Sequence, residues 1–209
     1  MCQLMAYGTH KPLTDWSVHE QFMDRAIVLG RLALQEGDGP VGCVIVKHGE
    51  LVGQGRNLVV TQSDPSAHGE IIALRDVSQR LGRAILHGTT LYTSMEPCPA
   101  CARAIVESGI STVVVGARHA DFITREHGSF SIESVLSAAS REIHLISGVR
   151  AAECRDLRYA ALEQSVRAQR GAGAVGSLTL LERISRWLRR LMGIACDGVA
   201  RTVQRSRRF

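Results

Sequence analysis

The sequence predicts a layered α/β domain built around a mixed sheet, and two observations indicate this class. A segment with helical spacing of apolar residues precedes two short apolar runs that are joined by a glycine turn. Further along, apolar runs alternate with helical segments, which is typical of a layered α/β domain. With 209 residues, of which 45% are hydrophobic, the chain can form one such domain plus an extension.

The first expected elements are a helix and a hairpin. Residues 18–36 place apolar side chains at helical spacing, namely Phe22, Ala26, Leu29 and Ala33. Glycine and proline in residues 37–40 end this helix. Residues 41–47 and 51–54 are short runs typical of strands, and Gly49 between them supplies the positive φ that a tight hairpin needs.

The later elements are expected to alternate. Turn-forming residues 61–66 precede a predicted helix at 67–79, which Ser66 or Asp64 could cap, so His68 would lie in its first turn. Pro99 suits the first turn of another helix. The remaining segments, in chain order, are a strand at 89–94, a helix at 99–108, strands at 112–115 and 142–146 on either side of a helix at 132–139, and a helix at 151–167.

Two short motifs carry metal-binding side chains: His-Gly-Glu at residues 68–70 and Pro-Cys-Pro-Ala-Cys at residues 97–101. Their imidazole and two thiolates suit Zn²⁺ and leave its fourth tetrahedral position for water. These ligands are His68, Cys98 and Cys101. Glu70 is not needed as a ligand and could move the protons of that water. We therefore predict a catalytic site with one Zn²⁺ per chain.

Each motif alone also has a structural interpretation. A C-x-x-C pair is often half of a structural zinc site or a redox pair, and Glu70 alone could be a surface helix residue. A closed site with three cysteines would need a further cysteine nearby in sequence, and none lies close. Cys43, within an apolar run, is expected to be a small core residue.

Residues 39–120 resemble the cytidine-deaminase-like superfamily, and segments 53–57, 64–70 and 90–101 carry the resemblance in the family's order. The resemblance implies a three-layer α-β-α fold with a five-stranded mixed sheet, in a homodimer or tetramer. It also implies hydrolytic loss of an exocyclic amine as ammonia, with Glu70 moving protons from water to a ring nitrogen and then to the leaving group.

The resemblance assigns further residues to substrate binding. Asn57 resembles the family asparagine that hydrogen-bonds the base, although it could instead be a turn residue that closes a strand. The backbone N–H of Gly69 would face the same pocket. Glu96, just before the cysteine motif, is the third predicted substrate-binding residue.

The motifs disagree about the substrate. The His-Gly-Glu motif and residues 90–93 resemble fungal-type cytosine deaminases, whereas residues 95–98 and 148–157 resemble guanine deaminases and bacterial tRNA adenosine deaminases. Residues 116–121 are not followed by the Lys-Thr-Gly-Ala run usual in the tRNA enzymes. We predict a free nucleobase or nucleoside of the cytosine or guanine type. The alternatives are tRNA adenosine-to-inosine deamination, a non-catalytic deaminase-fold subunit, and a binding module that acts through its tail.

The charge is divided unevenly along the chain. Residues 1–166 carry 15 Lys and Arg against 18 Asp and Glu, whereas residues 167–209 carry 10 against 2. The catalytic part is therefore slightly acidic, and gripping an RNA stem normally takes several Lys or Arg contacts. The net charge of +5 belongs to the tail.

Four regions are expected. They are an N-terminal extension at 1–16, a deaminase domain at 17–166, a flexible linker at 167–176 and a basic amphipathic helical tail at 177–209. The tail could contact an anionic membrane surface, nucleic acid or another protein, or cover an apolar patch of its own chain. Without an export signal or a long apolar run, we predict a cytoplasmic protein.

Overall fold

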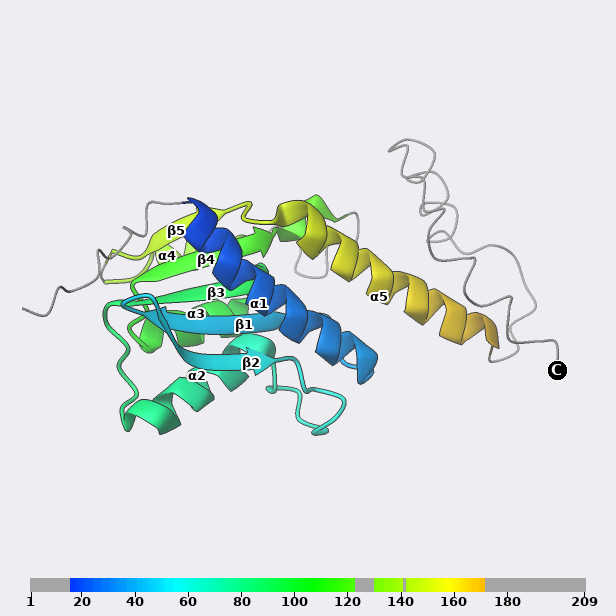
Figure 1. Ribbon diagram of the computed structural model, residues 1–209, viewed down its shortest axis with the longest axis horizontal. Coiled ribbons are helices and arrows are strands. Elements are labelled where there is room, and N and C mark those ends of the chain that lie inside the picture. Colours follow the sequence, from blue (N-terminus) through cyan, green and yellow to red (C-terminus); the bar gives the residue numbers. More distant parts are fainter. Residues whose placement is uncertain (1–15, 123–129, 141, 172–209) are drawn as a thin grey trace, which may run out of the picture. The chain divides into compact units, whose positions relative to one another are not determined.

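A five-stranded mixed sheet lies at the centre of the fold, with its strands in the order β2-β1-β3-β4-β5 (Figure 1). The strands are β1 Gly42–Lys47, β2 Glu50–Arg56, β3 Thr89–Met95, β4 Thr112–Ala117 and β5 His144–Ser147. β1 runs antiparallel to both β2 and β3, whereas β3, β4 and β5 are parallel. The predicted mixed sheet of five strands is confirmed.

The computed structural model describes residues 16–122, 130–140 and 142–171. Its helices are α1 Trp16–Gln35, α2 Gly69–Leu81, α3 Pro99–Glu107, α4 Ile132–Leu136 and α5 Ala151–Gly171, with a short 3₁₀ turn, η1, at His119–Asp121. The chain divides into one compact unit that ends at Leu162 and a second that begins at Glu163. The sheet and the candidate site belong to the first unit.

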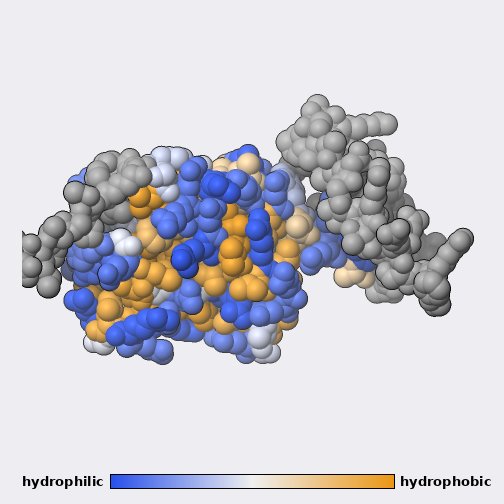
Figure 2. Space-filling view, in the orientation of Figure 1, coloured by the Kyte–Doolittle hydropathy of each residue, from blue (hydrophilic) through white to orange (hydrophobic). Residues whose placement is uncertain are grey.

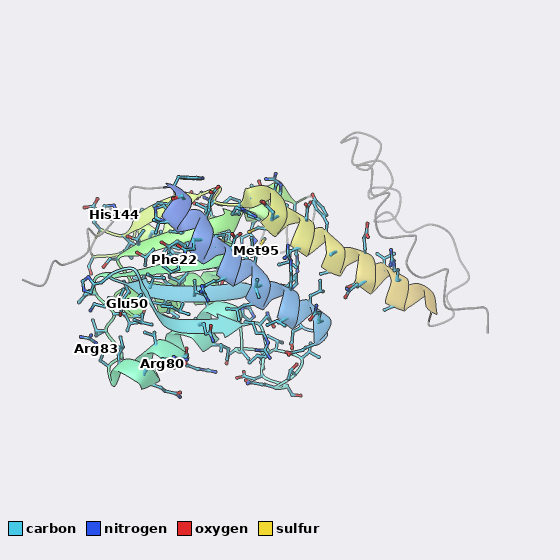
Figure 3. All side chains as sticks on the ribbon, viewed as in Figure 1. Phe22, Glu50, Arg80, Arg83, Met95 and His144 are labelled. Atoms are coloured by element: carbon cyan, nitrogen blue, oxygen red, sulfur yellow. The ribbon has the colours of Figure 1, made fainter. Side chains whose placement is uncertain are left out.

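Two apolar cores, one on each face of the sheet, hold the layers together. Successive residues of β3 point to opposite faces, so Leu91 packs with the α2, α3 and α4 side, and Tyr92 packs with α1 and the start of α5. Phe22 of α1 lies over the sheet (Figure 3), with its ring centroid 5.3 Å from that of Tyr92. The predicted three-layer α-β-α architecture is confirmed.

The first hairpin has the two-residue turn that its sequence indicates. His48 and Gly49 join β1 to β2 with φ values of 52° and 80°. Positive φ at both central residues is the geometry whose twist matches that of two antiparallel strands. The hairpin thereby places β2 at the edge of the sheet, where α2 packs against it.

Glycines in β2 let α2 approach the sheet closely. A Cβ on Gly55 would lie 2.4 Å from both the carbonyl oxygen of Gly69 and the backbone nitrogen of Ala73. These atoms belong to the first turns of α2, so any side chain at residue 55 would push the helix away. The glycine therefore sets the position of the N-terminus of α2.

The N-terminus of α2 differs from the prediction. The helix begins at Gly69, and His68 is its N-cap residue, in extended conformation and without a side-chain capping bond. The expected cap from Ser66 or Asp64 is wrong, because Asp64 Oδ1 accepts hydrogen bonds from the N–H and the hydroxyl of Ser66. This local turn uses the carboxylate before the helix starts.

The C-terminal regions are described only in part. α5 continues to Gly171, so residues 167–171, expected to begin a linker, are helical. The N-terminal extension was predicted at 1–16, but Trp16 is the first residue of α1. Residues 1–15, the rest of the predicted linker and the basic amphipathic helix predicted at 177–209 lie outside the described residues. None of the described helices is long and apolar enough to cross a membrane.

Apolar side chains also reach the surface. Figure 2 shows hydrophobic residues among hydrophilic ones on the face that it displays. Among the residues of α1, Val28 and Leu32 are 51% and 40% exposed. Apolar atoms normally make up much of a protein's surface, so this face does not by itself identify a partner. The predicted homodimer stays a prediction.

Candidate active site

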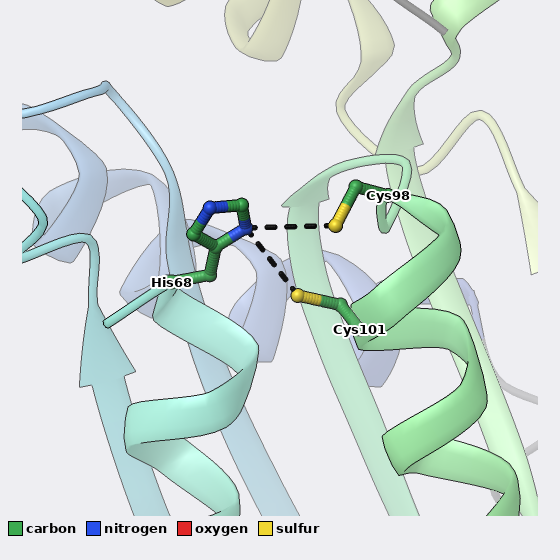
Figure 4. Close-up of side chains that lie close together, drawn as sticks. All are labelled: His68, Cys98 and Cys101. Carbon is green, nitrogen blue, oxygen red and sulfur yellow. Dashed lines mark hydrogen bonds between the residues drawn. The ribbon is translucent and has the colours of Figure 1, made fainter. Parts of the chain in front are cut away.

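Two helix N-termini bring the candidate zinc ligands together. His68 is the N-cap residue of α2 and Cys98 is the N-cap residue of α3, and both have extended backbone conformations. Cys101 lies in the first turn of α3. Because α2 and α3 pack side by side on the same face of the sheet, all three side chains point into the gap between their first turns (Figure 4).

The spacing of the three donor atoms fits a zinc ion. His68 Nδ1 lies 3.6 Å from Cys98 Sγ and 3.5 Å from Cys101 Sγ, and all three donor atoms lie within 4.8 Å of one another. Nitrogen and sulfur ligands at about 2.1 and 2.3 Å from a tetrahedral zinc are separated by roughly 3.6 Å. Among the described residues this is the cluster of histidine, cysteine and acidic side chains that could hold a metal. The donor types and their spacing therefore fit a zinc ion.

The surroundings at the start of α3 also change the pKa values of the two thiols. The pKa of Cys98 is lowered to about 4, chiefly because the Cys101 thiol donates a hydrogen bond to it, and backbone N–H groups of Cys101 and Ala100 add to the effect. The pKa of Cys101 is raised, because its proton is used in the same hydrogen bond and because it is buried. One thiolate is therefore ready for a metal at neutral pH, and metal binding would displace the second proton.

Glu70 lies beside this cluster without being one of its ligands. It is in the first turn of α2 and is only 3% exposed. Burial is the largest cause of its raised pKa, and the charge of Cys98 adds to it. Thr93 Oγ1, on β3, lies 3.3 Å from Glu70 Oε1. A buried carboxyl group next to a metal site, with a raised pKa, is typical of a group that transfers protons.

The predicted substrate-binding residues Asn57 and Gly69 lie at the same end of α2. Asn57 Oδ1 accepts the N–H of Val59 at 3.0 Å, as expected for the turn interpretation. Among the described residues its Nδ2 has no hydrogen-bond acceptor, so this amide can still donate to a ligand. The N–H of Gly69 is in the first turn of a helix, where no intrahelical acceptor exists. Both groups can therefore contribute donors near the cluster.

Glu96 has a different environment from the one expected of a substrate ligand. Its buried carboxylate accepts hydrogen bonds from the backbone N–H groups of His119 at 2.8 Å and Ile132 at 2.9 Å. It also accepts one from Arg118 Nε at 3.0 Å. Both oxygens are thus used by protein donors, an arrangement that favours a structural role. The substrate-binding role of Glu96 stays a prediction.

Two residues near the site were not singled out by sequence reasoning. Thr93 is one of four polar residues in β3, with Thr89, Thr90 and Ser94, so its sequence alone does not distinguish it from its neighbours. Arg118 follows β4, and its guanidinium contacts Glu96, Glu133 and Ser147. No local sequence pattern indicates those partners, because they come from three different elements.

Comparison with known proteins supports the interpretation of the cluster as a zinc-binding region. Residues 16–117 match the cytidine and deoxycytidylate deaminase zinc-binding region. Guanine deaminase from Bacillus subtilis is 42% identical over 104 residues, 49% of this chain and 67% of that protein. The tRNA-specific adenosine deaminase from Haemophilus influenzae is 39% identical over 136 residues, 65% of this chain and 78% of that protein.

Solved structures of similar fold come from the same kinds of deaminase. A guanine deaminase from Nitrosomonas europaea superposes with a TM-score of 0.59 at 27% identity, covering 68% of this chain and 84% of that one. A structure from work on A-to-I editing by tRNA:A34 deaminases also gives 0.59 at 28% identity, covering 66% and 98%. The fold and the ligand cluster define a deaminase domain with a zinc site. The chain belongs to the cytidine-deaminase-like superfamily.

Proposed function

We propose that this protein hydrolyses a free nucleobase or nucleoside of the cytosine or guanine type, replacing an exocyclic amine with a carbonyl oxygen and releasing ammonia. The observation that carries the proposal is the buried carboxyl group of Glu70 beside three metal ligands that do not need it. A structural zinc site has no use for such a group. A hydrolytic site needs one, because protons must be moved between water, ring and leaving group.

Each side chain of the cluster has a defined task. Zinc, when held by His68, Cys98 and Cys101, supplies a Lewis acid that makes water easier to deprotonate. Glu70 takes one proton from the attacking water and passes it to a ring nitrogen, then takes the proton of the hydroxyl group added to the ring and gives it to the leaving amine. Its burial raises its pKa above that of an exposed glutamate, which makes its carboxylate a stronger proton acceptor.

The substrate ring would be oriented by donors around the N-terminus of α2. The Asn57 amide and the Gly69 N–H lie at this end of the helix and can hydrogen-bond acceptors on a base. Nucleobases have carbonyl oxygens and ring nitrogens that accept such bonds. We infer that these two groups select the ring, whereas Glu96 supports the surrounding chain.

The charge of the domain supports a small substrate. Several arginines of the described first unit form ion pairs with carboxylates: Arg56 with Glu36, Arg75 with Asp64, Arg80 with Asp76, Arg103 with Glu107 and Arg118 with Glu96 and Glu133. Paired guanidinium groups attract a phosphate backbone less than unpaired ones do. A free base or nucleoside needs no such attraction.

Deamination of adenosine in tRNA is the second candidate function. The similarity to the Haemophilus influenzae tRNA-specific adenosine deaminase extends over 136 residues, further than the 104 residues shared with the Bacillus subtilis guanine deaminase. The two substrates differ in size but require the same chemistry at the ring. Only a direct comparison of activity on both kinds of substrate distinguishes the two candidate functions.

The test is a substrate panel for ammonia release by the full-length, zinc-loaded protein. The panel contains cytosine, guanine, their nucleosides, and an anticodon stem-loop RNA with a target adenosine. We expect ammonia from at least one free base or nucleoside. Release from the RNA alone would replace the proposal with the second candidate, and zinc without any release would favour a non-catalytic subunit or a tail-dependent binding module.

Glu70→Gln is the matched control for this panel. It keeps the shape of the side chain but removes the proton-accepting carboxylate. We expect the zinc content to be unchanged and kcat to fall by roughly 10² to 10⁴-fold. An unchanged rate would remove Glu70 from the reaction.

A further inference from the structure

Thr93 brings a hydroxyl group to the Glu70 carboxylate from the buried side of the site. The residue lies on β3, is fully buried, and points to the face of the sheet that α2 covers. Its Oγ1 lies 3.3 Å from Glu70 Oε1 and 2.9 Å from the carbonyl oxygen of Met95. The hydroxyl therefore has two acceptors and one proton.

This arrangement suits both protonation states of Glu70. When the carboxylate is ionised, the hydroxyl can donate to Oε1 and fix one of its two oxygens. When Glu70 is protonated, the hydroxyl can turn its proton to the Met95 carbonyl and offer a lone pair to the carboxylic acid. Because the Met95 carbonyl is a second acceptor, the Thr93 hydroxyl has a hydrogen-bond partner in both protonation states of Glu70.

We propose that Thr93 is a positioning residue whose hydroxyl holds the Glu70 carboxyl group in one orientation beside the ligand cluster. The inference rests on the proposed function, in which Glu70 moves protons. A carboxylate without this contact would adopt other rotamers, and only some of them would reach water or the substrate ring. The expected cost of losing Thr93 is thus in turnover and not in binding.

Three variants of the full-length, zinc-loaded protein test this role. Thr93→Val keeps the branched shape without the hydroxyl, and Thr93→Ser keeps the hydroxyl. Thr90→Val is the matched control, because it makes the same change in the same strand, at another buried residue on the opposite face. We expect Thr93→Val to lower kcat roughly 10-fold with KM and zinc content unchanged, and Thr93→Ser to restore most of it.

A double-mutant comparison shows whether Thr93 acts through Glu70. In the Glu70→Gln background, Thr93→Val should lower the residual rate no further, because the group it positions is gone. Equal losses in both backgrounds would overturn the proposal, as would a Thr93→Val enzyme that matches the wild type. A Thr90→Val variant with the same loss would assign the effect to the strand instead of the hydroxyl.

A spectroscopic measurement separates this inference from the proposed function. The infrared band of Glu70 can be identified, without any substrate, as the difference between the wild type and Glu70→Gln. Thr93→Val should shift this band, and Thr90→Val should not. A shift together with no ammonia release from the panel would reject the proposed reaction but keep the positioning contact, whereas an unshifted band would overturn the contact itself.

Discussion

Glu96 and Arg118 form an ion pair between a buried carboxylate and a partly exposed guanidinium at the carboxyl ends of two neighbouring parallel strands. Arg118 Nε donates to Glu96 Oε2 at 3.0 Å, and the Glu96 side chain is only 2% exposed. The same guanidinium donates to Glu133, whose side chain is 52% exposed, at 2.6 Å. One arginine thus joins a buried carboxylate to a surface carboxylate.

The two carboxylates should differ strongly in what they contribute to stability. Glu96→Gln places an amide NH₂ against protein donors and leaves Arg118 without its buried partner, so we expect a loss of about 3 kcal/mol in the free energy of unfolding. Glu133→Gln should cost at most about 1 kcal/mol, since water screens its pair. Urea unfolding of both variants measures the difference, and equal losses would show that burial is not the cause.

A buried pair, Tyr92 and His19, predicts a pH dependence. The Tyr92 hydroxyl lies 3.1 Å from His19 Nδ1, and burial raises the pKa of Tyr92 to about 12. The pKa of a tyrosine in the unfolded chain is about 10, so the folded state binds this proton more tightly. The resulting stabilisation is complete below about pH 10 and is lost as the pH rises from about 10 to 12.

The Tyr92→Phe variant tests this titration. It keeps the ring that packs on Phe22 but has no proton to lose. The difference in unfolding free energy between wild type and variant should stay constant up to about pH 10 and then move against the wild type. Phenolate absorbance should show one fewer late-titrating group in the variant. A difference that is constant through this range would contradict the raised pKa.

Periodicity and motif spacing predicted most of the architecture, because those signals are local. The glycine turn at Gly49 and the apolar runs on either side indicated the hairpin. The two motifs indicated His68, Cys98 and Cys101, which the structure brings together. The sequence did not indicate the start of α2, because two capping candidates preceded it and one of them, Asp64, is used by a local turn.

The surroundings of the cluster could not be predicted in the same way, because they depend on the packing of distant segments. The environment of Glu96 follows from β3 and β4 being parallel neighbours, which brings His119 to its carboxylate, and from α4, whose first residue, Ile132, donates to the same carboxylate. In sequence His119 and Ile132 lie 23 and 36 positions after Glu96. The position of Glu96 next to the cysteine motif therefore indicates none of these donors, and its substrate-binding role stays a prediction.

Removal of individual thiols should identify the zinc ligands. Cys98→Ser and Cys101→Ser each replace a thiolate donor of the cluster, and we expect the zinc content to fall from about one per chain to well below half. Cys154→Ser makes the same change at a buried cysteine of α5 that is outside the cluster and should retain the metal. Metal analysis after dialysis measures all three. Full zinc content in Cys98→Ser would exclude Cys98 as a ligand.

The close approach of β2 and α2 links the fold to the metal site. In Gly55→Ala the new Cβ would lie 2.4 Å from backbone atoms of Gly69 and Ala73, which cannot rotate away as a side chain would. The helix must therefore shift and carry His68 with it, away from the thiols of α3. We expect a loss of about 3 kcal/mol in unfolding free energy and at least roughly tenfold weaker zinc binding.

Gly88→Ala separates this effect from the general cost of replacing a glycine. Gly88 has a φ of 72° and nothing within 4 Å of a new Cβ, so the change strains only its own backbone and should cost about 1 kcal/mol. Zinc affinity should be unchanged in Gly88→Ala, because this residue contacts neither α2 nor α3 through a new side chain. If both variants bound zinc as tightly as the wild type, the position of α2 would not control the site. If only Gly55→Ala lost affinity, the glycine in β2 would be part of what places His68 opposite Cys98 and Cys101.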